Sequence, residues 1–230
     1  MKSLKEFIAG IIEKFVSHSN DAIHDKIYWE YWLETIVHQR PLIVTDFSEN
    51  LSLPLQQEPQ SLYWLRKQVS ILSGIITACR DTEEQKIYLG HFSQDRDHDQ
   101  VYVRLALENM IPLFLSEDDT HIFIHSDNAT HFKSSENYAD IQELCNSLQI
   151  TIIRSFGVPG HGKGEIDSCG GHIKTACRKG IEHGVSIKSA SDCVAFLNNK
   201  FRDKKSPSYH ISEISEDNLD EETAPEVLEL

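Results

Sequence analysis

Apolar and polar residues follow one another along this chain with two different periods, and these predict helices in some segments and strands in others. Residues 3–18 and 21–39 carry large apolar side chains at helical spacing, so we predict an N-terminal pair of amphipathic helices, the second capped at Asn20 or Asp21. Their aromatic residues are expected to lie in a core. Shorter apolar runs predict strands at 41–46, 68–79, 86–92, 121–126 and 150–156.

Helical spacing returns between and after the later strands, and the resulting order of elements predicts the fold class. The further helices are expected at 98–115, 136–148, 165–182 and 189–202. A hairpin-rich start followed by alternating strands and helices implies an α/β fold, in which helices cover both faces of a mixed sheet. This order is also that of the ribonuclease H-like fold. Residues 47–62, which contain prolines and several glutamines, are expected to form a loop.

Charge is distributed unevenly over these elements. The formal net charge is −14, yet residues 163–205 hold nine basic and five acidic side chains, and residues 206–230 hold eight acidic side chains and no Lys or Arg. A uniformly acidic protein repels phosphate backbones, whereas a locally basic segment can lie along nucleic acid. We therefore divide the chain into a helical segment (1–39), a main domain (40–205) and an acidic tail (206–230) that we expect to be disordered.

Two classes of protein fit the composition poorly. No apolar run approaches the roughly 20 residues that span a membrane, so a membrane partner is not expected. The five cysteines are odd in number and lack the spacing of a disulfide framework, which favours reduced thiols in an intracellular compartment. None of these patterns encodes an oligomeric state.

Two aspartates share a sequence context that suggests a ligand site. Asp46 and Asp127 each follow an apolar run of a predicted strand, where a carboxylate would lie near the carboxyl end of the sheet. A partly buried carboxylate at this position needs a cation, hydrogen bonds or solvent. Each aspartate taken alone is equally compatible with a turn or a cap, so the pair carries more weight than either one.

The stretch 157–172, GVPGHGKGEIDSCGGH, concentrates more reactive side chains than any other part of the chain. Glu165 or Asp167 could add a third carboxylate to the two strand-end aspartates. Carboxylates that share divalent cations can promote phosphodiester chemistry. The glycines before these acids would allow the chain to approach the sheet edge closely.

Two other interpretations of this stretch remain open at the level of its residues. Residues 157–163 match the GxxxxGK spacing of a phosphate-binding loop, although Gly164 stands where that motif has Ser or Thr. Cys169, His172 and Cys177 supply three potential zinc ligands, whereas a closed structural site needs four.

Three segments together resemble a group of eukaryotic transposase-like proteins with a ribonuclease H-like DDE/D catalytic core. The segments are VTDFSEN (44–50) with a following glutamine-rich stretch and YWLRKQ (56–68), HSDNATHFKSSENY (125–138), and GHGKGEIDSCGGHIK (160–174). The resemblance covers roughly residues 40–180, and its third segment is the most specific because many positions agree at once. Asn128 departs from the group, which often has Gly there. No zinc finger or helix-turn-helix that would bind DNA is recognisable.

The resemblance implies a site and an activity. It implies that Asp46, Asp127 and Asp167 are the catalytic, metal-binding triad, with Asp167 favoured over Glu165. It also implies Mg²⁺ or Mn²⁺ as the cofactor and DNA as the partner. A protein that acts on DNA is expected in the nucleus. His161, Lys163 and Lys174 are expected to contact the substrate phosphates. His98 and Asp99 also match recurring positions, and Asp99 is expected to cap the helix that follows it. The alternative function is a non-catalytic interaction module that keeps the fold.

Overall fold

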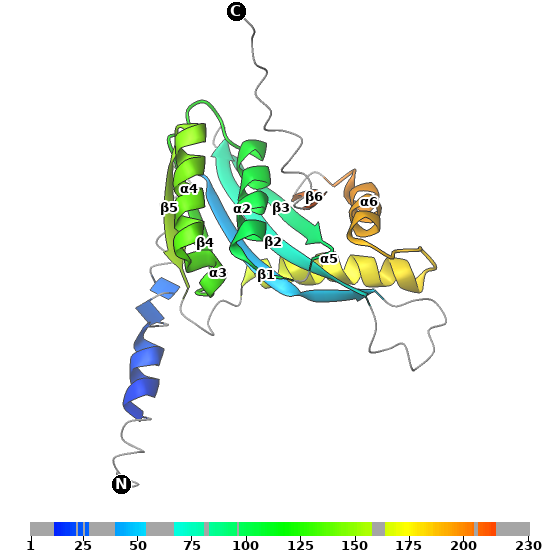
Figure 1. Ribbon diagram of the computed structural model, residues 1–230, viewed down its shortest axis with the longest axis horizontal. Coiled ribbons are helices and arrows are strands. Elements are labelled where there is room, and N and C mark those ends of the chain that lie inside the picture. Colours follow the sequence, from blue (N-terminus) through cyan, green and yellow to red (C-terminus); the bar gives the residue numbers. More distant parts are fainter. Residues whose placement is uncertain are drawn as a thin grey trace, which may run out of the picture.

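The computed structural model describes residues 12–21, 23–24, 26–27, 40–53, 67–80, 83–95, 97–157, 164–204 and 207–214. These residues form an α/β fold in which helices flank a mixed sheet of six strands (Figure 1). The strands are β1 (Leu42–Leu53), β2 (Lys67–Arg80), β3 (Glu83–Ser93), β4 (His121–Ser126), β5 (Thr151–Phe156) and β6 (Ser208–Glu213). The helices are α2 (Gln100–Met110), the short 3₁₀ helix η2 (Ile111–Leu113), α3 (Thr130–Lys133), α4 (Ser135–Leu148), α5 (Glu165–Glu182) and α6 (Ala190–Phe201).

The strand order in the sheet is β5-β4-β1-β2-β3-β6. Strands β1, β2 and β3 are antiparallel neighbours along the chain, while β4 pairs with β1, β5 with β4, and β6 with β3 in parallel. Parallel neighbours need a crossover connection, and between β4 and β5 the helices α3 and α4 supply it. The predicted mixed sheet with helices on both faces is confirmed.

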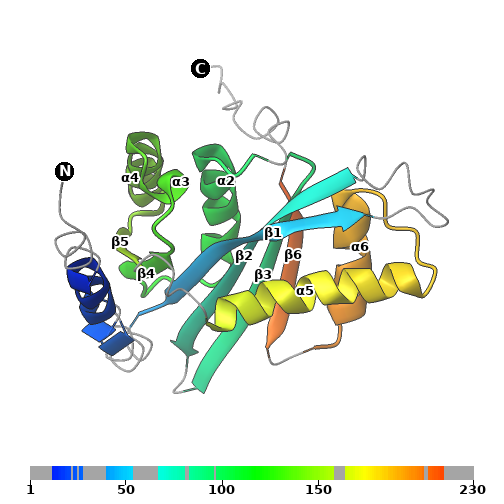
Figure 2. The same cartoon turned by 90° about the horizontal axis from the view of Figure 1, so that it is seen from below.

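The alternation of side chains across the sheet separates two apolar cores. Helices α2, α3 and α4 cover one face and α5 and α6 the other (Figures 1 and 2). On β2, for example, Leu72 and Ile76 face the first group of helices, whereas Ile71 and Ile75 face the second. Both faces of the central strands are therefore buried, which explains why their sequences read as nearly continuous apolar runs.

Strand β1 is longer than the sequence predicts, and it contains an irregularity just after Asp46. The strand continues to Leu53, through residues expected to begin a loop, while residues 54–62 lie outside the described part of the chain. Ser48 pairs with Ile71 but Leu51 pairs with Val69, so β1 has one extra residue here, a β-bulge. The bulge shifts the alternation, and consequently Phe47 contacts the α2 side while Leu51 lies on the α5 side.

The N-terminal helical segment differs from the prediction in two respects. Asn20 and Asp21 lie inside a helix, so neither begins a second helix, since the described residues from 12 to 27 are all helical. The expected core positions there are exposed: the relative accessibility of Phe15 is 69% and that of Ile27 is 59%. No helix among the described residues is long and apolar enough to span a membrane.

The acidic tail also contains regular structure that the sequence analysis missed. Residues 208–213 form β6 at the edge of the sheet beside β3, and Ile211 and Ile214 are buried. Asn198 of α6 donates a side-chain hydrogen bond to the Ile211 carbonyl at 2.9 Å. The folded domain therefore extends at least to Ile214, past the boundary expected at 205.

A candidate acidic site between β1, β4 and α5

The pairing of β1 with β4 brings two of the predicted aspartates side by side. Thr45 pairs with Ser126 in the parallel register, so Asp46 and Asp127 are the next residues along each strand. Neighbouring strands are about 5 Å apart, and residues in matching register lie on the same face. Strand β4 ends at Ser126, so Asp46 lies where β1 loses this neighbour even though β1 itself continues. The strand-end position predicted for Asp127 is confirmed, and Asp46 reaches the same edge from within a strand.

Helix α5 brings Asp167 to this edge. Gly164 precedes the helix, and its N–H donates to Asp167 Oδ2 at 3.2 Å, which orients the carboxylate in the first turn. One turn further on, Gly170 lies directly over Ser48 and Ser73, and a Cβ at this position would overlap Ser48 Oγ. This close approach is possible only because Gly170 has no side chain.

Glu165, the other candidate for the third acid, is engaged elsewhere. Its carboxylate accepts hydrogen bonds from Lys86 Nζ at 3.0 Å and from Tyr88 Oη at 2.6 Å, both on β3. Of the two acids in this turn, it is Asp167 whose charge acts on Asp46.

The other two carboxylates act electrostatically on Asp46. The pKa of Asp46 is raised from 3.8 to about 6, first by burial and then by the charges of Asp127 and Asp167, against a smaller lowering by a hydrogen bond from the Phe47 backbone. Asp46 is half-buried, so its carboxylate is poorly solvated and has two like charges beside it. The ionised site is therefore repulsive, and a cation would relieve that repulsion.

Backbone hydrogen bonds orient the carboxylates without using all their oxygens. The Ala129 N–H donates to Asp127 Oδ1 at 3.1 Å, so this acid forms the turn that was its alternative interpretation. Asp167 uses Oδ2 in the same way at the start of α5. A carboxylate has two oxygens, so one oxygen can hold the turn while the other faces a ligand.

Three carboxylates supply the hard oxygen donors that Mg²⁺ and Mn²⁺ prefer. Among the described residues, however, no three His, Cys, Asp or Glu side chains form a group compact enough to hold a metal ion. The donor chemistry and the repulsion at Asp46 fit a divalent cation, whereas the side chains are more widely spaced than a closed set of ligands. An ion at this site would have to draw the carboxylates together.

Two histidines lie beside the acidic site, around the Phe47 ring. His98 stacks on Phe47 with ring centroids 4.1 Å apart, and its Nε2 shares a hydrogen bond of 2.9 Å with Asn50 Oδ1 in the bulge. His131 meets the Phe47 ring edge-on at 4.8 Å. Burial lowers the pKa of His131, while the charge of Asp127 partly opposes that lowering. Sequence reasoning missed His131, although it stands only four residues after Asp127.

The residues expected to contact substrate divide into two groups. His161 and Lys163 lie outside the described part of the chain, and the phosphate-loop interpretation of residues 157–163 falls largely there too. Lys174 is half-buried on α5, where its Nζ donates to the Glu49 carbonyl at 3.3 Å. Lys174 stands seven residues after Asp167, so both lie on nearly the same side of the helix.

Asp99 caps α2 as predicted, accepting the Tyr102 N–H at 2.9 Å.

The zinc interpretation is wrong because its three residues diverge. Cys169 is buried against the sheet, with Sγ 3.9 Å from the Gly74 and Leu89 carbonyls. His172 shares a hydrogen bond with Tyr209 Oη at 2.7 Å, and Cys177 is buried against Cys193 of α6. The three side chains belong to different environments and form no metal-binding group.

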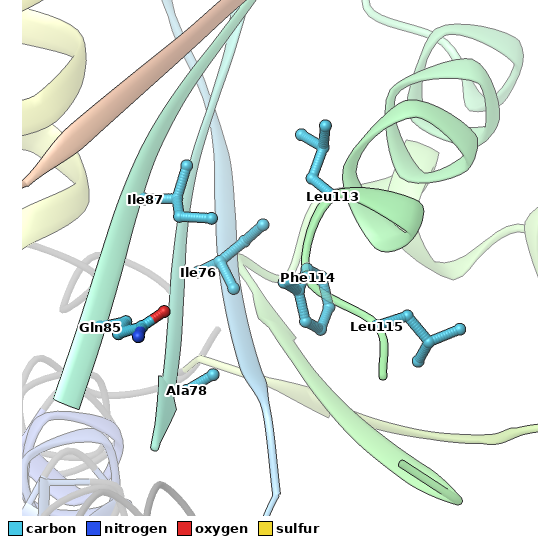
Figure 3. Close-up of a pocket in the computed structure, with 7 residues that line it drawn as sticks. All are labelled: Ile76, Ala78, Gln85, Ile87, Leu113, Phe114 and Leu115. Carbon is cyan, nitrogen blue, oxygen red and sulfur yellow. The ribbon is translucent and has the colours of Figure 1, made fainter. Parts of the chain in front are cut away.

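A separate apolar pocket lies near the start of β1. It has a volume of about 210 Å³ and opens between the β2–β3 hairpin and the end of α2 (Figure 3). Its lining, which contains no ionisable side chain, comprises Ile76, Ala78, Gln85, Ile87, Leu113, Phe114 and Leu115. Ile76 pairs with Ile43 near the start of β1, whereas Asp46 pairs with Ser73. The pocket is thus distinct from the acidic site and offers no group for acid–base chemistry.

Comparison with known proteins gives a family without an assigned activity. A family model described as "Domain of unknown function (DUF8701)" matches residues 25–225. No curated protein matches the sequence.

Similarity to solved structures is weak. A chain in the cryo-EM structure of the simian T-cell lymphotropic virus intasome in complex with PP2A regulatory subunit B56 gamma is 12% identical, with a TM-score of 0.45, over 74% of this chain and 51% of that chain. A chain in the crystal structure of NurA bound to dAMP and manganese is 10% identical, with a TM-score of 0.17, over 88% of this chain and 47% of that chain. This chain therefore spans about half the length of each, and both TM-scores are too low to identify the fold.

Proposed function

This chain belongs to the DUF8701 family, and because a domain of unknown function offers no activity to carry over, we propose a function from the acidic site itself. We propose that the protein is a transposase-derived nuclease or strand-transfer domain that acts on DNA phosphodiesters with Mg²⁺ or Mn²⁺. The observation that carries this proposal is the register of β1 and β4, which places Asp46 beside Asp127, while the charge of Asp167 from α5 also acts on Asp46. Three motifs far apart in the sequence thus supply carboxylates to one edge of the sheet.

We infer that the fold is ribonuclease H-like. Support comes from the order of the first five strands across the sheet, β3-β2-β1-β4-β5, in which an antiparallel meander is followed by two parallel strands. The sixth strand, β6, adds to the edge beyond β3. In this arrangement the acidic site lies beside the central strand, between the two halves of the sheet.

In the proposed activity, Asp46, Asp127 and Asp167 would hold the divalent cation. When bound, the cation supplies a charge that favours ionisation of the attacking water or hydroxyl and stabilises the leaving oxygen. Asp46 must be ionised to contribute, and a cation that offsets the repulsion from its neighbours lowers its pKa toward the ordinary value. The backbone hydrogen bonds to Asp127 and Asp167 limit how these carboxylates can turn. His98 and His131 border the site around the Phe47 ring, and the charge of Asp127 acts on His131.

The decisive experiment compares two variants in the same turn of α5. We expect Asp167→Asn, like Asp127→Asn, to reduce Mn²⁺-dependent cleavage of duplex DNA by at least roughly 100-fold, because each removes a carboxylate from the metal site. Glu165→Gln removes the same charge two residues earlier, from a side chain that binds Lys86 and Tyr88, and should retain cleavage within about 3-fold. Equal losses in Asp167→Asn and Glu165→Gln would contradict the proposal.

A binding measurement separates an inactive site from an absent one. We expect Mn²⁺ to raise the unfolding temperature of the wild type, since a ligand that binds only the folded state stabilises it, and not to raise that of Asp127→Asn.

The second candidate function is a non-catalytic nucleic-acid or protein interaction module, which the open spacing of the carboxylates favours. Equal responses of wild type and Asp127→Asn to Mn²⁺ in both stability and cleavage would select that module.

A further inference from the structure

A group of three lysines surrounds His172 on the α5–α6 side of the sheet. Burial lowers the pKa of His172, and the positive charges of Lys204, Lys200 and Lys179 lower it further. His172 and Lys179 stand seven residues apart on α5, so they lie on nearly the same side of that helix. Lys200 is in the last turn of α6, and Lys204 follows shortly after its end. All three lysines are exposed, so their ammonium groups are accessible to a partner.

Aromatic rings hold this group in place. Phe201 and Tyr209 stack with ring centroids 4.1 Å apart, and Lys204 Nζ lies 5.2 Å from the centre of each ring. His172 Nδ1 shares a hydrogen bond of 2.7 Å with Tyr209 Oη. We call His172, Lys179, Lys200, Lys204 and Tyr209 the lysine surface. Its residues lie on or next to α5, α6 and β6, and α6 packs against both of the other elements.

The positive charge of the lysine surface is not neutralised by ion pairs within the described part of the chain. The salt bridges formed between described residues use Lys86 and Arg104, and none uses a lysine of this surface. Concentrated positive charge is unexpected in a protein with a net charge of −14. An anionic partner would be attracted to this positive charge.

We propose that the lysine surface is a binding site for the phosphate backbone of nucleic acid. This proposal rests on the proposed function for the identity of the polyanion, and it extends that function by giving the nucleic acid a contact away from the acidic site. Helix α5 carries both features, because Asp167 lies in its first turn and Lys179 lies twelve residues later. A rise of about 1.5 Å per residue separates them by roughly 18 Å, which corresponds to about five base pairs of duplex.

The aromatic rings of this surface are unsuited to stacking with bases. The ring of Tyr209 already stacks on Phe201 and meets Tyr88 edge-on at 5.4 Å, so its neighbours occupy the positions that a base would need. Lysines are point charges that contact phosphates rather than read base edges. Binding through this surface should therefore be independent of sequence and strongly dependent on salt.

The test measures DNA binding by fluorescence anisotropy in EDTA, with a labelled duplex, so that no divalent cation contributes. The double variant Lys200→Glu/Lys204→Glu should lose at least roughly 10-fold in affinity at about 50 mM salt, and the slope of log affinity against log salt should fall by about 2. The matched control Lys14→Glu/Lys67→Glu makes the same change in net charge at exposed lysines on other elements and should lose less than about 3-fold.

A milder pair guards against unfolding, since Lys204 contacts two rings. Lys200→Gln/Lys204→Gln keeps the length of both side chains and should lose roughly 3- to 10-fold in affinity with an unchanged far-ultraviolet circular dichroism spectrum. Equal losses in the lysine-surface and control variants would overturn the proposal, as would a wild type without measurable binding at about 50 mM salt. Tighter binding of an acidic peptide with the sequence of residues 215–230 than of the duplex would also overturn it, because the ligand would then be a protein segment.

The two proposals can fail separately. Asp127→Asn should bind DNA in EDTA as tightly as the wild type, because the lysine surface is intact. If Asp127→Asn also cleaves DNA like the wild type while Lys200→Glu/Lys204→Glu still loses binding, the proposed function fails and the lysine surface stands. If Asp127→Asn loses cleavage while Lys200→Glu/Lys204→Glu binds DNA normally, the proposed function stands and the lysine-surface proposal fails.

Discussion

Asp46 is the residue whose ionisation depends most on its surroundings in the acidic site. Its carboxylate is half-buried, and the charges of Asp127 and Asp167 act on it, so both effects favour the protonated form. Folded protein therefore binds a proton at Asp46 more tightly than unfolded protein does. As pH rises from the unfolded pKa of 3.8 through the folded pKa of about 6, ionisation of Asp46 costs stability. The structure thus keeps a destabilising group at neutral pH, which is common for functional residues.

Replacing Asp46 should therefore stabilise the protein at neutral pH in the absence of metal. We expect Asp46→Asn to raise the free energy of unfolding at pH about 8 by about 1–2 kcal/mol, after allowing for solvent screening, and the gain should vanish below pH about 4. Urea unfolding in EDTA at several pH values measures this. Asp192→Asn is a control of opposite sign, because hydrogen bonds from the Lys188 backbone and Ser189 lower the pKa of Asp192. Asp192→Asn should therefore lower the free energy of unfolding above pH about 4. A higher free energy of unfolding there would contradict this prediction.

The aspartates and their neighbours also show which site residues a sequence can predict. The positions of Asp46 and Asp127 at the sheet edge were predictable because each follows an apolar run, whereas the residues alone left Glu165 and Asp167 open and only the resemblance favoured Asp167. His131 was not predictable, because it reaches Phe47 only through the packing of the four-residue helix α3, which has no periodicity of its own. Its proximity to Asp127 depends on tertiary structure alone.

At the scale of elements, α5 connects the acidic site to the lysine surface. Asp167 lies in its first turn, Gly170 contacts β1 and β2, and His172 and Lys179 lie toward α6 and β6. Gly170 and Gly171 would ordinarily weaken a helix, yet α5 continues through both, as the spacing of its apolar residues predicted. The structure shows that only Gly170 is required by packing, since a Cβ on Gly171 would meet no atom within 4 Å.

The two adjacent glycines offer a matched test of this packing. Gly170→Ala should destabilise the protein by about 1–3 kcal/mol, because its Cβ would overlap Ser48 Oγ and lie 2.9 Å from Ser73 Oγ, two atoms that hydrogen-bond to each other. It should also reduce cleavage, since relief of the overlap moves Asp167 away from Asp46. Gly171→Ala should stabilise by up to about 1 kcal/mol through helix propensity. Thermal and urea unfolding of both variants measure this, and equal effects would show that α5 is not pressed against β1 at Gly170.

The strands and helices of the main domain were predictable to within a few residues, and the exceptions have physical causes. The part of β1 after Asp46 was not predicted because the bulge at Glu49 and Asn50 reverses the alternation of side chains. Residues 42–53 therefore do not show a single period of two. The break predicted near Asn20 failed because the preference of Asn and Asp for helix caps does not prevent them from being helical where the surrounding residues favour helix.

At the scale of the whole molecule, the sixth strand joins the acidic C-terminal region to the domain. The sequence SYHISE has polar or charged residues at four of six positions, so no apolar run identified it as a strand. Only pairing with the exposed edge of β3 and packing against α6 make it favourable. β6 contributes Ile211 to the core on the α5 side and Tyr209 to the lysine surface. The boundary of the folded domain therefore lies after Ile214 rather than at residue 205.

Two truncations test this boundary. A chain that ends at Ser206 loses β6, and with it the buried side chains of Ile211 and Ile214, each of which contributes about 1.5–3 kcal/mol. That loss is a large part of the 5–15 kcal/mol typical of a domain, so we expect a large fall in unfolding temperature or insoluble protein. A chain that ends at Ser215 keeps β6 and should unfold within about 2 °C of the full-length protein.

Ile211→Ala in the full chain should lower the free energy of unfolding by about 2–4 kcal/mol. This substitution separates the packing of β6 from the effect of the acidic residues that both truncations remove. Equal stability of the two truncated chains would show that β6 is not part of the cooperative fold, and the lysine surface would then lose the Tyr209 that anchors it.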